Sequence, residues 1–265
     1  MTKAFCSIAV IGALCTYLTF SACSNQDAPR SPQEFVGQPS ISSEASIPQI
    51  VQTTPNPLDL PAETALSDEV LEAYGEDSCF GVFEISDELF ERMYGRTYKD
   101  ECAVSRDDLR YVRVLHVNEE GKILTGEIVV NVAIADEVCE IFRELYEAHY
   151  PIERMRLADD YEADDIASME DNNSSGFNYR PIEGTSRPSK HALGLAIDIN
   201  TFYNPYYRCS DDFVSPEASA QYLDRSKDFP YKIEEGDLCY RLFTEHGYTW
   251  GGHWKSVKDY QHFEK

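Results

Sequence analysis

Two segments near the end of the chain hold residue types that bind a catalytic metal ion. Residues 189–198 read Ser-Lys-His-Ala-Leu-Gly-Leu-Ala-Ile-Asp, and the second segment runs from Trp250 to Glu264. A hydrolytic zinc site has three protein ligands of the nitrogen and oxygen type and leaves a fourth position for water. His191, Asp198 and His262 supply that set. We therefore predict that these three residues bind Zn²⁺.

The second segment also contains a candidate proton carrier. Asp259 stands three residues before His262, so that a turn can aim both side chains at one point. A carboxylate placed there can take a proton from water, which is general-base catalysis beside a metal-activated nucleophile. A serine hydrolase built on Ser189 is a weaker interpretation, because the chain has no Gly-x-Ser-x-Gly elbow.

The pattern resembles the VanY-like family of zinc D-alanyl-D-alanine carboxypeptidases and L-alanyl-D-glutamate endopeptidases. The family signature Ser-x-His-x-x-Gly-x-Ala-x-Asp matches residues 189–198 at every fixed position. Further similarity lies in residues 150–152 and 172–180, so the resemblance covers the chain from around residue 125 to residue 265, whereas residues 64–120 show no signature. It implies a hedgehog/DD-peptidase-like α+β domain, with an antiparallel sheet and flanking helices.

The resemblance assigns roles to single residues. It implies that His191, Asp198 and His262 are the zinc ligands and that Asp259 is the catalytic acid and base. Arg180 is implied as the residue that polarises the scissile carbonyl and stabilises its oxyanion, for which a fixed guanidinium is well suited. Arg187 lies nearby in the sequence and is the alternative.

The expected substrate is an amide bond in the stem peptides of peptidoglycan. Ser189 and Trp250 are predicted to contribute to substrate binding, with a buttressing role for Ser189 and a core role for Trp250 as the alternatives. Carboxypeptidase and endopeptidase activities both remain open, although an aspartate at position 259 favours the endopeptidase branch. The rival function is that of a non-catalytic, zinc-containing lipoprotein of the same fold that binds the cell wall.

Hydrophobic patterning predicts the elements that position these residues. The predicted elements are a hairpin of residues 109–117 and 123–132, helices at 136–149 and 237–246, a strand at 195–200, and short strands around 249–250 and 261–263. Such a mixture without regular βαβ alternation favours an α+β domain with an antiparallel sheet. The acidic stretch 159–171 lacks the spacing of a calcium loop and is predicted to be a solvated loop.

The N-terminus indicates export. Lys3 precedes an apolar run that ends in Phe20-Ser21-Ala22-Cys23, which resembles a bacterial lipobox. We predict a lipoprotein signal peptide at 1–22, a lipidated Cys23, a disordered Pro/Ser-rich tether at 23–65 and a zinc peptidase domain at 66–265. The protein is thus expected to be exported and anchored to a bacterial membrane through its N-terminal lipid.

Charge and cysteine content restrict the partners and the chemistry further. The chain has 47 acidic and 23 basic residues, which argues against a nucleic-acid partner. Five of the eight cysteines lie in the predicted domain, at positions 79, 102, 139, 209 and 239. One or two disulfides are expected in an exported protein. A structural thiolate zinc site is not expected, because no Cys-x-x-Cys pair is present.

Overall fold

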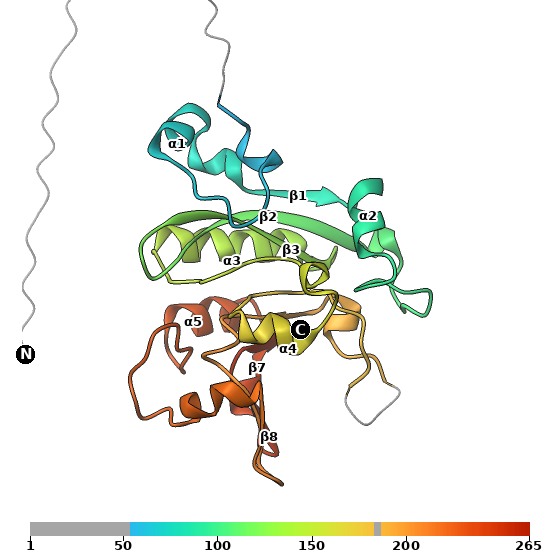
Figure 1. Ribbon diagram of the computed structural model, residues 1–265, viewed down its shortest axis with the longest axis vertical. Helices are drawn as coiled ribbons and strands as arrows, with labels where there is room; N and C mark the ends of the chain where they lie inside the picture. Colours follow the sequence, from blue (N-terminus) through green and yellow to red (C-terminus); the bar gives the residue numbers. More distant parts are fainter. Residues whose placement is uncertain (1–53, 183–186) are drawn as a thin grey trace, which may run out of the picture. The chain divides into compact units, whose positions relative to one another are not determined.

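Residues 54–182 and 187–265 are described by a computed structural model (Figure 1). They belong to a folded unit that spans Val51–Lys265. The predicted signal peptide, Cys23 and most of the predicted tether lie outside the described residues. None of the described helices combines the length and the apolar character that a membrane span requires.

Helices and strands are mixed along the described chain. The helices are α1 (Asp68–Tyr74), α2 (Asp87–Met93), α3 (Ala135–Glu147), α4 (Asp165–Glu170) and α5 (Leu238–Glu245). The strands are β1 (Gly81–Glu84), β2 (Leu109–Val117), β3 (Ile123–Asn131), β4 (Ala196–Asp198), β5 (Tyr206–Arg208), β6 (Phe213–Ser215), β7 (Thr249–Trp250), β8 (Val257–Asp259) and β9 (His262–Glu264). The α+β prediction is confirmed.

The largest sheet has the order β1-β2-β3 and is antiparallel. The predicted hairpin forms β2 and β3, and the backbone N–H of Asn118 donates to Lys122 O across the turn. The predicted amphipathic helix is α3, which packs on β2. Its side chains Val138, Ile141 and Leu145 are fully buried, because apolar residues at helical spacing form one continuous stripe.

The segment that precedes α1 is part of this fold. The backbone N–H of Glu63 donates to Thr125 O at 2.7 Å, and that of Thr125 donates to Thr64 O at 3.0 Å. Residues 57–59 form a 3-10 helix that begins after Asn56. The predicted disorder of the tether at 23–65 is therefore wrong for its last part, because residues 57–59 form a helical turn and residues 63–65 exchange solvent for backbone hydrogen bonds with the edge of β3.

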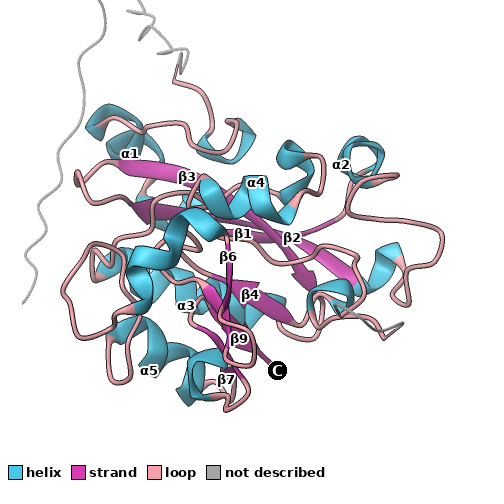
Figure 2. Cartoon of the chain, turned by 60° about the horizontal axis from the view of Figure 1, so that its bottom comes forward, coloured by secondary structure: helices cyan, strands magenta, loops and turns pink. Residues whose placement is uncertain are grey.

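Two small antiparallel sheets follow, with the orders β4-β9-β7 and β6-β5-β8. Strands β8 and β9 are separated only by Tyr260 and Gln261, yet they pair in different sheets. Figure 2 shows β4, β9 and β7 side by side below the longer strands of the first sheet. The structure therefore has three small sheets where the sequence predicted one, and the turn between β8 and β9 joins two of them.

The acidic stretch differs from the prediction of a solvated loop. Residues 158–161 form a 3-10 helix, and α4 begins at Asp165. Asp164 caps α4, because its Oδ1 accepts from the backbone N–H groups of Ile166 and Ala167. Acidic side chains at a helix N-terminus satisfy unpaired backbone donors and suit the helix dipole. The acidic residues of this stretch, from which a solvated loop was predicted, therefore lie in the first turns of two short helices, and Asp164 caps the second of them.

The cysteines of the domain are all free. Cys79 and Cys239 are buried, Cys102 and Cys139 are partly buried, and Cys209 is exposed. The expectation of one or two disulfides is therefore wrong for these five residues. Burial raises the pKa of the Cys79 thiol and that of the Cys239 thiol, which keeps both in the unreactive protonated form.

Candidate metal centre and catalytic site

The three predicted ligands meet in one buried cluster, and the loop and strand pairing explains why. Asp198 at the end of β4 lies directly opposite His262 in β9, as a cross-strand pair. His191 comes from the short 3-10 turn His191–Leu193 that leads into β4. The neighbouring strand residues Ile197 and Ile199 are fully buried in the core. The alternation along this segment thus sends the carboxylate of Asp198 to the site and the apolar side chains of Ile197 and Ile199 to the core.

The ligand atoms lie at the separations expected around a single ion. His191 Nε2 is 3.1 Å from Asp198 Oδ2, and His262 Nδ1 is 2.9 Å from Asp198 Oδ1. The two imidazole nitrogens are 3.1 Å apart. Around a tetrahedral zinc with ligand bonds of about 2.0 Å, neighbouring donor atoms are about 3.3 Å apart. The two imidazole nitrogens thus lie near the separation of two corners of such a tetrahedron, and each of them has an oxygen of Asp198 within 3.1 Å.

A backbone carbonyl decides which nitrogen of His191 points to the centre. His191 Nδ1 lies 2.7 Å from Gly176 O, and since a carbonyl only accepts, Nδ1 carries the proton. Nε2 is then left with its lone pair toward the cluster. Gly176 is required here, because a Cβ on it would lie 2.5 Å from Val129 O of the first sheet. The close approach of this segment to β3 therefore sets the orientation of a ligand.

Glu264 performs the same task for His262 and was missed by the sequence analysis. Its Oε2 lies 3.1 Å from His262 Nε2, which therefore donates its proton and leaves Nδ1 to face the centre. Glu264 stands two residues after His262 in the same strand, so both side chains lie on one face. The two-residue spacing of His262 and Glu264 is the feature of the sequence from which this partner could have been predicted. A carboxylate that holds the outer N–H of a ligand histidine is a common feature of zinc sites.

The protonation of the cluster shows that it favours a cation. Burial opposes the charged form of Asp198, but His191 and His262 outweigh it and hold the pKa of that carboxyl well below its usual range. Burial likewise opposes the charged form of His262, yet hydrogen bonds to Asp198 and Glu264 raise its pKa to about 10. Asp198 on the inner side of His262 and Glu264 on its outer side thus stabilise positive charge, which the His262 proton supplies in the absence of an ion. A zinc ion would replace that proton at Nδ1, and the residues present fit it.

Asp259 approaches this cluster from the other sheet. It ends β8, which pairs with β5, and the two-residue turn at 260–261 returns the chain to His262. Among the described residues its buried Oδ1 has no hydrogen-bond partner. Burial raises the pKa of Asp259 to about 6, and the nearby charge of Asp198 adds to the rise, while His262, His191 and Arg180 oppose it. A carboxyl that titrates near neutrality is suited to proton transfer.

Gly251 lets Asp259 lie this close to the chain that carries Trp250. A Cβ at position 251 would meet Asp259 O at 2.6 Å and Asp259 Cβ at 2.8 Å. The glycine therefore allows a close backbone approach that holds the aspartate at its place beside the ligands.

Arg180 lies at the edge of the site, close enough to lower the pKa of Asp259. Its Nε forms an ion pair with Asp165 at the start of α4. The other carboxylate oxygen of Asp165 accepts from Asn178 Nδ2 at 2.8 Å. Asn178 in turn donates its backbone N–H to His191 O. The acidic stretch thus supplies a residue that organises the segment on which Arg180 lies.

The two predicted substrate contacts, Ser189 and Trp250, are both buried. Ser189 is buried, and its Oγ accepts from the backbone N–H of Ala192, so it caps the turn that carries His191. Trp250 is buried and donates its indole N–H to Tyr260 O at 2.9 Å. These contacts favour the alternatives, a buttressing role for Ser189 and a core role for Trp250. Trp254 instead lies at the site, with its ring centroid 5.2 Å from that of His262.

We expect Glu264→Ala to weaken zinc binding about 10- to 100-fold, the usual effect of removing the outer partner of a ligand histidine. Glu264→Gln, which keeps an acceptor oxygen, should lose less. The measurement is zinc affinity by competition with a chromogenic chelator, and Glu245→Ala, at an exposed position, is the matched control. Equal affinity of Glu264→Ala and the unaltered protein would show that Glu264 does not orient His262.

Most of the candidate site residues lie in a segment that is similar to a known family. No curated protein and no solved structure matches the chain. Residues 183–265 match the family model described as D-alanyl-D-alanine carboxypeptidase, a range that includes the three ligands and Asp259 but not Arg180. Over these residues the chain is similar to the D-alanyl-D-alanine carboxypeptidase family of peptidases, which supports the resemblance found in its sequence.

Proposed function

We propose that the protein is a zinc-dependent peptidase that hydrolyses an amide bond in the stem peptides of peptidoglycan. The observation that carries this proposal is the buried cluster of His191, Asp198 and His262, whose ligand atoms face one point with their tautomers set by Gly176 and Glu264. The family match over residues 183–265 supports a peptidase activity. The substrate rests on the resemblance.

Each residue of the site has a distinct task in this reaction. A bound zinc ion supplies Lewis-acid activation of water and of the scissile carbonyl. Asp259 takes a proton from the attacking water and later delivers it to the leaving amine, so that water and amide yield one carboxylate and one amine. Arg180 stabilises the negative charge that develops on the carbonyl oxygen. Its partner Asp165 holds the guanidinium in position.

The position of Asp259 also distinguishes catalysis from the rival function of a zinc-containing binding protein. A binding protein has no use for a buried carboxylate beside the cluster whose Oδ1 lacks a partner, because such a group costs stability.

We also propose that the protein is exported and anchored by a lipid on Cys23, which would bring the peptidase to the cell wall. This part of the proposal rests on residues 1–23 of the sequence.

The proposed function predicts zinc-dependent cleavage of purified, soluble muropeptides. Mass spectrometry of the digests should show one new product, and a chelator should abolish it until zinc is restored. Loss of a terminal alanine identifies a carboxypeptidase, and cleavage between alanine and glutamate identifies an endopeptidase. Muropeptides left intact by the zinc-loaded protein would contradict the proposed substrate. Equal cleavage with and without chelator would contradict the role of the metal.

A further inference from the structure

A cavity lies on the β1-β2-β3 sheet, where Tyr111, Arg113 and Glu127 contribute to its lining. Its volume is about 860 Å³, within the range of pockets that bind small ligands. The walls are the N-terminal segment from Asn56 to Ala62, the end of β1 with Phe83, and the start of α2 with Glu88. The residues of the metal centre do not line it.

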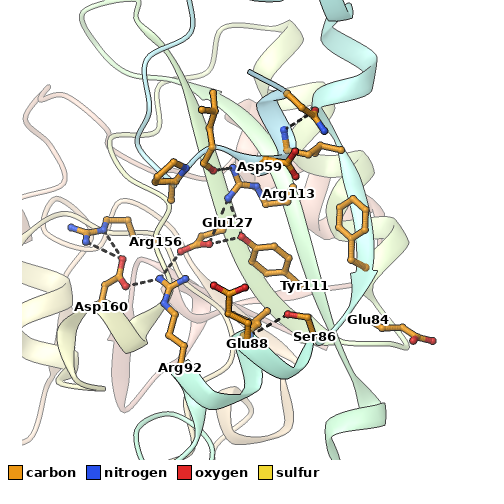
Figure 3. A pocket seen from close by; sticks show the side chains of 17 residues that line it. Asp59, Glu84, Ser86, Glu88, Arg92, Tyr111, Arg113, Glu127, Arg156 and Asp160 are labelled. Atoms are coloured by element: carbon orange, nitrogen blue, oxygen red, sulfur yellow. Dashed lines mark hydrogen bonds and ion pairs between the residues drawn. The ribbon is translucent and has the colours of Figure 1, made fainter. Parts of the chain in front are cut away.

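A chain of paired charges forms the floor of this cavity (Figure 3). Arg113 and Glu127 are directly opposite each other in β2 and β3, and each is only 3 % exposed. Tyr111 joins them: its hydroxyl donates to Glu127 Oε2 at 2.5 Å and accepts from Arg113 Nη1 at 2.9 Å. Arg92 from α2 donates to Glu127 Oε1 at 2.7 Å. Figure 3 shows these side chains converging on one space.

The network continues along one wall of the cavity. Arg92 also bonds Asp160 at 2.5 Å, and Arg156 binds the other oxygen of Asp160 at 2.9 Å. A buried ion pair stabilises a fold no better than apolar side chains of the same size would. The presence of this network in the lining of a cavity therefore calls for a reason other than stability.

The charges that line the cavity nearly balance. The lining contains three arginines and five carboxylates, so its formal charge is −2. Such a lining disfavours an anion, while arginine donors and carboxylate acceptors side by side match hydroxyl groups, which both donate and accept. Phe83, 39 % exposed, and the Tyr111 ring add apolar surface. The ring of Phe83 lies over Gly81, where a Cβ would come within 2.5 Å of it.

We propose that this cavity binds a neutral, hydroxyl-rich sugar unit, in particular one of the N-acetylated glycan that carries the stem peptides. The inference rests on the proposed function, because that function supplies the glycan. Sugar hydroxyls would exchange hydrogen bonds with the arginine and carboxylate groups, and the apolar face of the ring would pack on an aromatic side chain. The cavity would thus hold the polymer while the metal centre acts on its peptide.

The test uses N-acetylglucosamine tetrasaccharide, which contains no peptide, and measures its binding to the full chain by calorimetry and by NMR shifts. Phe83→Ala and Glu88→Gln are the informative variants, because both side chains are exposed and their loss should leave the fold intact. Each should weaken binding, by up to about tenfold for the lost aromatic contact. Exposed Phe213 lies outside the cavity, so Phe213→Ala is the matched control. Equal thermal midpoints of the variants check that they are folded.

A second readout separates this inference from the proposed function. Both cavity variants should cleave soluble, glycan-free stem peptides at the normal rate, yet bind and digest insoluble peptidoglycan less well. Absence of tetrasaccharide binding, or binding that neither variant weakens, overturns the cavity's role even if stem peptides are cleaved. Failure to cleave stem peptides, with tetrasaccharide binding intact, overturns the proposed reaction and leaves the sugar site standing.

Discussion

Asp259→Asn abolishes most of the hydrolysis while zinc binding remains. The amide keeps the size of the carboxylate but takes no proton from water, and removal of a general acid–base group usually costs about 10²- to 10⁴-fold in rate. Asp259 is not one of the three clustered ligands, so the metal content should stay at one zinc per chain. The measurements are the turnover of a stem peptide and the zinc content of the purified variant.

The stability of the same variant is a further check. Because burial raises the pKa of Asp259 to about 6, its ionised form is destabilising in the folded protein, and the thermal midpoint of Asp259→Asn should not fall. Asp228→Asn, on an exposed residue, is the matched control and should behave like the unaltered protein. Undiminished turnover by Asp259→Asn would mean that another group carries the proton.

His191→Ala should lose both zinc and activity. The substitution removes one of three protein ligands and leaves the remaining two too few for a hydrolytic zinc site. Its effect on zinc affinity should exceed the 10- to 100-fold expected for Glu264→Ala, which removes only an outer partner. Zinc content after dialysis and turnover of a stem peptide measure the two losses.

The control for this variant is His246→Ala, which applies the same change to a histidine that faces Glu137 at 3.8 Å rather than the cluster. It should keep zinc and full turnover. Retention of stoichiometric zinc by His191→Ala would show that the metal is held elsewhere, and it would remove the observation on which the proposed function stands.

Local patterns in the sequence predicted the elements that are themselves local. The hairpin of β2 and β3 and helix α3 were predicted because their apolar spacing and their turns lie within a few residues. The N-terminal segment was not predicted, since residues 54–65 are polar and proline-rich and the hydrogen bonds of residues 63–65 are made with the distant strand β3. The helix starts in the acidic stretch were missed because capping depends on which backbone groups a carboxylate reaches.

The sequence by itself determined the types and order of the candidate ligands and the spacing of Asp259 and His262, because signature and spacing are properties of the chain. Only the tertiary structure decided how these residues are held: β4 pairs with β9, Gly176 O and Glu264 set the two imidazole tautomers, and Asp165 binds Arg180. Most of these contacts join residues far apart in the chain. Their partners are set by strand pairing and close backbone approach, which no local pattern in a single sequence records.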